Sequence, residues 1–180
     1  MDATQTALIG AAIGAATAIS AAALTSYVTL RSERIRQEQA RRAVRTQTLR
    51  QHAADVFGAI FRISYAISWI TWYATHHEAS LTEDEVASYD DALRGAYPDL
   101  LSSSAAVAAI DLATYEALTN IFEPVFELEE GTSQALYRLA TNRERGLEEL
   151  RSYRASALDV NEKIPREIAR VMQLAEDRVH

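Results

Sequence analysis

LRQHAADVFGAIFRISYAISWITWYA, residues 49–74, is the stretch from which the fold can be predicted. Its aliphatic residues recur at alternating intervals of four and three, the heptad spacing of a helix that buries one seam. The seam consists of Leu49, Ala53, Val56, Ile60, Ile63, Ile67 and Ile70. Aromatic residues occupy much of the remaining circumference, so we expect a helix that is apolar nearly all round. Such a helix must be buried, either in a helical bundle or in lipid.

Two environments for this helix remain open. In the first, residues 53–74 form the core helix of a cytosolic bundle. In the second, residues 56–74 cross a membrane as a second span, with aromatic residues at the lipid–water interface. The second arrangement places Arg62 in hydrocarbon, which costs about 2.5–3.5 kcal/mol at the centre of a bilayer. The bundle core is therefore the preferred prediction.

An uncharged stretch lies upstream of the seam and extends from Ala3 to Leu30. As a helix that rises about 1.5 Å per residue, residues 7–30 would reach about 36 Å, enough to cross a hydrocarbon core of roughly 30 Å. The residues before it carry only Asp2 and no basic side chain, unlike a secretory signal peptide. The sequence therefore predicts one transmembrane helix at residues 7–30, after a short external N-terminus at residues 1–6.

Arginine residues follow this span at once. Residues 1–50 hold seven arginines against three acidic residues, a net charge of +4, whereas residues 51–180 carry −11. The positive-inside rule then predicts a single-pass protein of the cell membrane, with its N-terminus outside and the rest in the cytoplasm. Residues 31–52 contain no Gly or Pro and are predicted to form a helical stalk. We assign topology and contact with anionic headgroups to Arg31, Arg34, Arg36, Arg41, Arg42 and Arg45.

Small residues recur every four positions within the predicted span, at Gly10, Gly14, Ala18 and Ala22. Small residues at this spacing let two helix backbones approach closely in lipid. The pattern predicts self-association through this face and hence a homo-oligomer. The alternative is that an alanine-rich span produces the spacing by chance.

The rest of the chain, residues 53–180, is predicted to form a bundle of antiparallel helices, and no alternating strand pattern occurs in it. The expected fold class is therefore all-α. Thr82 and Glu85 match a capping box and mark the start of a helix, which we expect to end near Gly95, before Pro98.

Further helix boundaries are expected downstream. A helix is predicted over residues 99–122, with Pro124 kinking or splitting it from the residues that follow. Gly131 is expected to break the chain before a helix that ends near Leu158. Asn161 is the expected N-cap of the last helix.

The composition excludes several kinds of chemistry. The chain has no Cys, which rules out thiolate metal sites, disulfides and cysteine nucleophiles. The acidic body and the absence of aromatic residues among the clustered arginines argue against a nucleic-acid partner. His76 and His77 are the main metal-ligand candidates, but adjacent residues of a helix point about 100° apart. We therefore predict no catalytic residues, no metal and no cofactor.

The expected function is that of a membrane-anchored, non-enzymatic module that self-associates and acts as a scaffold at the cytoplasmic face. Its expected partners are the lipid bilayer, further copies of the chain and a cytosolic protein. An alternative is a membrane-perturbing or pore-forming effector in which residues 56–74 insert as a second helix. A metal-dependent enzyme that uses His76 and His77 is a third, less favoured hypothesis.

Overall fold

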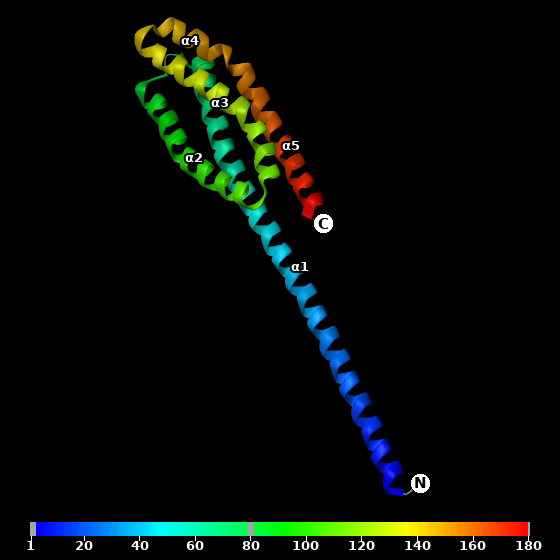
Figure 1. Ribbon diagram of the computed structural model, residues 1–180. Helices are drawn as coiled ribbons and strands as arrows, with labels where there is room; N and C mark the ends of the chain where they lie inside the picture. The colour runs from blue at the N-terminus through cyan, green and yellow to red at the C-terminus, as the bar shows by residue number, and fades with distance from the viewer. Residues whose placement is uncertain (1–2, 79–80, 180) are drawn as a thin grey trace. The chain divides into compact units, whose positions relative to one another are not determined.

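The computed structural model describes the backbone of residues 3–78 and 81–179, and the side chains of residues 25–78 and 81–175. Throughout this part of the chain the regular structure is helical and no strand occurs, which confirms the all-α prediction. The five helices are α1 (Ala3–His76), α2 (Glu83–Ile110), α3 (Leu112–Thr141), α4 (Arg143–Ser152) and α5 (Arg154–Val179) (Figure 1).

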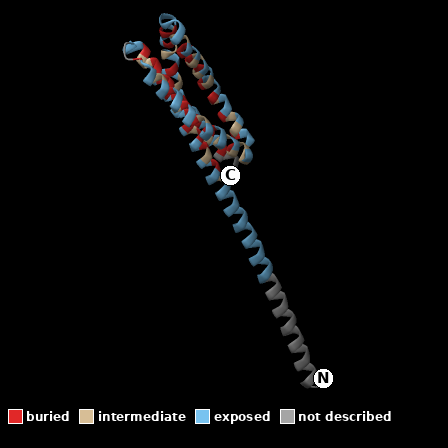
Figure 2. Cartoon of the chain, turned by 90° about the vertical axis from the view of Figure 1, so that its left-hand side faces the viewer, coloured by how far each residue is buried: buried red, intermediate tan, exposed pale blue. Residues whose placement is uncertain are grey.

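The chain divides into two compact units, residues 1–44 and residues 45–180. In the first unit, every side chain that the structure describes, from Thr25 to Val44, is exposed. The second unit holds the hydrophobic core, to which all five helices contribute residues. Figure 2 shows the buried residues of this unit along the sides of the helices that face one another.

Within the second unit, α1 presents two different sides. All seven residues of the predicted seam are buried, and from Val56 to Ile70 the five seam residues have no exposed surface. The opposite side is open, because Phe61, Tyr65 and Trp69 keep 42%, 57% and 45% of their surface exposed. The expectation of a helix buried nearly all round is therefore wrong. The neighbouring helices cover only part of its circumference.

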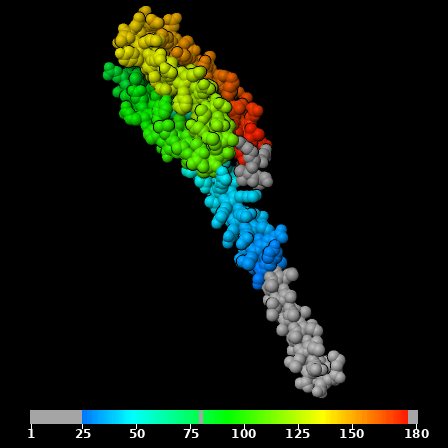
Figure 3. Space-filling view, viewed as in Figure 1, coloured from blue at the N-terminus to red at the C-terminus, as the bar shows by residue number. Residues whose placement is uncertain are grey.

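The other helices pack against one another around α3. Helix α3 lies beside α2, α4 and α5, and α4 also contacts α5. Figure 3 shows the surface of α3 between those of α2 and α5. Polar contacts join α1 to three of these helices, because Arg62 pairs with Asp99 of α2, Arg151 of α4 binds the carbonyl of Ala74, and α5 contacts Ser68.

Helix α2 begins as predicted but does not end where the sequence suggested. The backbone N–H of Thr82 donates to the Glu85 carboxylate at 3.4 Å, so the capping box is present. The helix then passes Gly95 and Pro98, which are exposed, and ends at Ile110. Buried residues on its opposite side, among them Leu100, outweigh the single hydrogen bond that the proline removes.

Helix α3 likewise runs through Pro124 and Gly131, so the expected break at Gly131 is wrong, and Pro124 does not split the helix. Pro124 is exposed, and the residues that hold the helix in the core lie on its other side. Gly131 serves close packing instead of breaking the chain, since a Cβ atom there would stand 2.7 Å from the Tyr153 ring.

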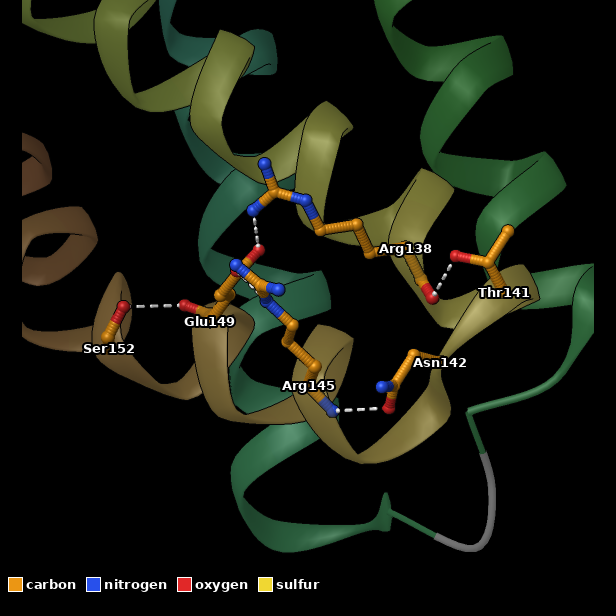
Figure 4. A network of polar contacts seen from close by, with 6 residues as sticks. All are labelled: Arg138, Thr141, Asn142, Arg145, Glu149 and Ser152. Atoms are coloured by element: carbon orange, nitrogen blue, oxygen red, sulfur yellow. Dashed lines mark hydrogen bonds and ion pairs between the residues drawn. The ribbon is translucent and has the colours of Figure 1, made fainter.

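The actual breaks are single residues at Asp111, Asn142 and Tyr153. At Asn142 the backbone N–H donates to the carbonyl of Arg138 at 2.7 Å, which closes α3. The Asn142 side chain accepts the N–H of Arg145 at 3.2 Å, which caps α4 (Figure 4). The expected N-cap at Asn161 is wrong, because that residue lies inside α5.

Among the residues whose side chains are described, one helix near the N-terminus, Thr25–His76, is long and apolar enough to cross a membrane. The arginine-rich residues 31–50 carry too many charges for such a crossing, so the apolar part is the seam segment between residues 51 and 76. Half of this part is buried. The predicted span at residues 7–30 lies, for residues 7–24, outside the described side chains.

Candidate interaction surface

The exposed side of α1 in the second unit carries a row of aromatic rings, which we call the aromatic face. It consists of three exposed residues, Phe61, Tyr65 and Trp69, and three partly buried ones, Phe57, Trp72 and Tyr73. Side chains four residues apart lie one above the other on a helix, so the four-residue spacing from Phe57 to Tyr73 produces this row. It is a second apolar side of α1, distinct from the buried seam.

Contacts between the rings hold the aromatic face in order. Tyr65 and Trp69 stack with their ring centroids 6.4 Å apart, and Trp69 and Trp72 stack at 5.3 Å. Tyr73 meets Trp69 edge to face at 5.1 Å. Aromatic pairs contribute about 0.5–1.5 kcal/mol each beyond the area they bury. The result is a pre-ordered apolar surface of the residue types that are enriched at interfaces.

A cavity of about 290 Å³ opens beside the aromatic face, between α1 and α2. Tyr65 and Trp69 form one wall, and Ser88, Tyr89 and Ala92 of α2 line the other. The small side chains of Ser88 and Ala92 leave Tyr65 and Trp69 accessible from this direction.

A second, more polar cavity of about 520 Å³ also lies between α1 and α2. Arg62 lines both cavities and pairs with Asp99 of α2. Both partners are about half exposed, so this ion pair contributes only about 0–1 kcal/mol to stability. Its role is to orient the two side chains at the boundary between the cavities.

A polar network joins α1 to α5 on another side of the seam. Ser64 donates to the side-chain oxygen of Asn161, and the Asn161 amide nitrogen donates to the hydroxyl of Ser68. Arg154 donates to the Ser68 carbonyl at 2.8 Å. Ser64 and Ser68 are buried, so these hydrogen bonds satisfy groups that would otherwise be costly to bury. The network fixes how the two helices pack, and it has no nucleophile–base pair.

A second network links α2 to α3. Tyr97 donates to the Glu129 carboxylate at 2.9 Å, and Ser133 donates to the same carboxylate at 2.7 Å. The Tyr89 hydroxyl lies 3.4 Å from that of Ser133. Burial raises the pKa of both phenols, and for Tyr97 the hydrogen bond to Glu129 raises it further. Both phenols therefore stay neutral at physiological pH and act as hydrogen-bond donors or acceptors.

The corner between α3 and α4 is closed by a charged cluster (Figure 4). Arg138 of α3 binds the Glu149 carboxylate of α4, and Arg145 approaches its other oxygen at 3.3 Å. The hydrogen bond from Arg138 is the main reason that the pKa of Glu149 is lowered. The cluster fastens the two helices to each other and presents no group positioned for chemistry.

The residues assigned to the membrane fall partly outside the described region. The self-association predicted for Gly10, Gly14, Ala18 and Ala22 lies outside the residues whose side chains the structure describes. The arginines assigned to topology are all exposed. Arg45 belongs to the second unit, where its guanidinium donates to the carbonyl of Ile110.

His76 and His77 lie exposed at the end of α1 and point toward an aromatic ring. The ring centroids of His76 and His77 are 5.5 Å and 4.7 Å from that of Trp72. Within residues 25–78 and 81–175, no group of three or more His, Cys, Asp or Glu residues could hold a metal ion. The structure thus places the two histidines against Trp72 of the aromatic face and does not bring them together with other metal-ligating residues among those it describes.

Sequence reasoning missed the exposure of Phe61, Tyr65 and Trp69. A usable signal is present, because their four-residue spacing belongs to a different side of the helix from the seam. It also missed the caps at Asp111 and Asn142, although Asn and Asp are preferred N-cap residues. Comparisons with protein-family models, with curated proteins and with solved structures find no match to this chain.

Proposed function

We propose that this chain is a membrane-anchored, non-enzymatic helical protein that self-associates and serves as an interaction module at the cytoplasmic face of the cell membrane. The observation that carries the proposal is the uncharged stretch from Ala3 to Leu30, followed at once by arginines. Gly10 and Gly14 would bring two spans together. The residues from 53 to 180 would form the cytosolic antiparallel bundle.

The second unit supports a role in binding proteins. Its aromatic face exposes Tyr65 and Trp69, residues of the kind that supply much of the energy of protein interfaces. Its polar networks, including those of Asn161 and Glu129, hold helices together. The described residues thus offer a surface for contact and an ordered scaffold beneath it.

Membrane anchoring is tested by fractionation of cells that express the full chain. We expect the protein to remain in the membrane pellet after carbonate extraction, because a spanning helix leaves the bilayer only on addition of detergent. Of two reporters fused after His180, one active only in the cytoplasm and one active only outside the cell, we expect activity from the cytoplasmic reporter alone. Recovery of the protein in the supernatant would exclude the anchor.

Self-association through the span is tested by the double substitution Gly10→Ile and Gly14→Ile in a membrane two-hybrid assay. The bulky side chains should separate the two helix backbones and lower the signal about tenfold, since this contact depends on close packing. Ala11→Ile with Ala15→Ile is the matched control, because these residues lie to one side of the proposed face. An equal loss in both variants would contradict the assigned face.

The second candidate is a membrane-perturbing effector, and one observation favours it. The apolar segment between residues 51 and 76 is itself long enough to cross a membrane. Insertion would require the seam residues, among them Ile60 and Ile67, to leave the core in which they are buried. Expression should then cause ion leakage and place a reporter after His180 outside the cell. A cytoplasmic reporter without leakage would leave the anchored module as the better proposal.

A further inference from the structure

A groove runs between α3 and α5 and encloses a cavity of about 490 Å³. Its apolar lining comes from both helices: Ala117, Ile121 and Pro124 of α3, and Val160, Ile164 and Val171 of α5. We call this the α3–α5 groove. It lies wholly within the second unit.

Charged side chains line the α5 side of this groove in alternating order. They are Asp159, Lys163, Glu167 and Arg170, at spacings of four, four and three residues, which places them in one row along the helix. All four side chains are more than half exposed. We call this row the α5 rim.

Within one chain, the rim charges pair with their neighbours. Lys163 lies 2.6 Å from Asp159, and Arg170 lies 3.8 Å from Glu167. Exposed pairs of this kind within a helix are weak. The rim charges therefore remain able to interact with a second surface that approaches the groove.

The order of the rim charges is complementary to itself when the helix is reversed. If a second α5 lies antiparallel, with the midpoint near residue 165, Asp159 faces Arg170 of the other copy and Lys163 faces Glu167. Each charge then meets its opposite. A parallel arrangement in register would place each charge against an identical one, which is repulsive. The charge order thus selects one orientation.

We propose that the α3–α5 groove binds the α5 rim of a second copy of this chain, in a two-fold symmetric, antiparallel contact. The attraction comes from the lining residues that keep exposed surface, which are Ala117, Ile121, Pro124 and Val160, whereas Ile164 and Val171 are already buried. The rim charges set the register. A two-fold interface requires a self-complementary surface, which the rim provides. The inference shares one element with the proposed function, namely that the partner is a second copy of the chain. It does not depend on the proposed contact between the spans, because every residue it uses lies between Ala117 and Val171.

The orientation is tested by cysteine crosslinking of the full chain in detergent. The chain has no Cys, so Asp159→Cys and Arg170→Cys each introduce a single thiol. In the antiparallel contact, two copies of residue 159 are displaced by eleven residues, about 16 Å along the helix, whereas residues 159 and 170 meet. A short bismaleimide should therefore crosslink a mixture of the two variants and neither variant alone.

Three results would overturn the inference. Crosslinking of each variant with itself, without a mixed product, would indicate a parallel contact. No crosslink in any sample would mean that the groove takes another occupant, such as a different protein or a small apolar ligand. If dilution reduces the yield of the mixed product to that of an unrelated protein with a single thiol, the crosslink would come from random collision and not from a dimer. The Gly10→Ile, Gly14→Ile result decides the proposed span contact separately, because it concerns different residues.

Charge reversal provides an independent test by analytical ultracentrifugation of the full chain. Glu167→Lys alone, or Lys163→Glu alone, creates two like-charge contacts in the dimer and should weaken it roughly tenfold. The double variant orders the rim as acidic, acidic, basic, basic, which is again complementary on reversal. It should restore association to within about threefold, although it replaces the two pairs within each helix by a single pair between positions 163 and 167.

Arg166→Glu is the matched control. Arg166 lies on a different side of α5, where it pairs with Glu162 at 2.8 Å. This variant loses an exposed pair of the same kind without altering the rim, so its association should be unchanged. If the double variant associates as weakly as the single variants, or Arg166→Glu is equally weak, the rim does not contact a second copy.

Discussion

Gly146 of α4 lies against the backbone of Leu139 in α3, so closely that a Cβ atom on Gly146 would stand 2.7 Å from the Leu139 nitrogen. The carbonyl oxygen of Ala135 would be 2.9 Å from the same atom. Backbone atoms cannot move aside as a flexible side chain does. The short connection at Asn142 therefore depends on a residue without a side chain at this point of α4.

We predict that Gly146→Ala lowers the free energy of unfolding by about 1–3 kcal/mol, because the added methyl forces α3 and α4 apart. Chemical denaturation followed by circular dichroism measures the change. Gly95→Ala is the matched control, since a Cβ atom on Gly95 meets nothing within 4 Å. That control should gain about 0.5–1 kcal/mol from higher helix propensity. Equal effects of the two substitutions would contradict the close contact.

Removal of the Asn161 side chain should also destabilise the fold. Asn161→Ala leaves the hydroxyl of Ser64 without its partner, and Ser64 is buried. An unsatisfied buried polar group costs about 1–3 kcal/mol, which denaturation would detect. Adding Ser64→Ala should recover part of this loss. Gln173→Ala, an exposed change on the same helix, should stay within about 0.5 kcal/mol. A loss for Gln173→Ala as large as that for Asn161→Ala would exclude the network as the cause.

The two sides of α1 should respond differently to truncation. Ile63→Ala removes a fully buried seam residue and should cost about 2–5 kcal/mol. Tyr65→Ala removes a half-exposed ring whose main aromatic contact is Trp69, and should cost about 1 kcal/mol. Denaturation curves of both variants test this difference. A larger cost for Tyr65→Ala would mean that the aromatic face is covered in the folded protein.

The corner between α3 and α4 should weaken in acid. Because the bond from Arg138 lowers the pKa of Glu149 in the folded state, the folded chain binds that proton less readily than the unfolded chain. The resulting stability is present above the ordinary glutamate pKa of about 4.3 and is lost as the pH falls through the lowered folded value. Glu149→Gln should therefore flatten the fall in stability below about pH 5. Unchanged acid sensitivity in this variant would assign the fall to other carboxylates.

Helical class, the seam and the first cap could be predicted from local sequence. The heptad from Leu49 to Ile70 depends only on spacing, and the Thr82–Glu85 capping box involves residues three positions apart. The errors concerned residues whose effect depends on surroundings. Pro98, Pro124 and Gly131 interrupt a helix only where tertiary packing does not hold it, and here buried neighbours hold it.

The sequence by itself determined that the chain is helical, where its charges cluster and which residues form the buried seam, because periodicity and charge act over a few neighbouring residues. Only the tertiary structure decided that Tyr65 and Trp69 stay exposed, that Asn161 satisfies Ser64, and that the α5 rim borders a groove. These features depend on which helices lie side by side. Contacts between residues nearly a hundred positions apart leave no local pattern from which they could be read.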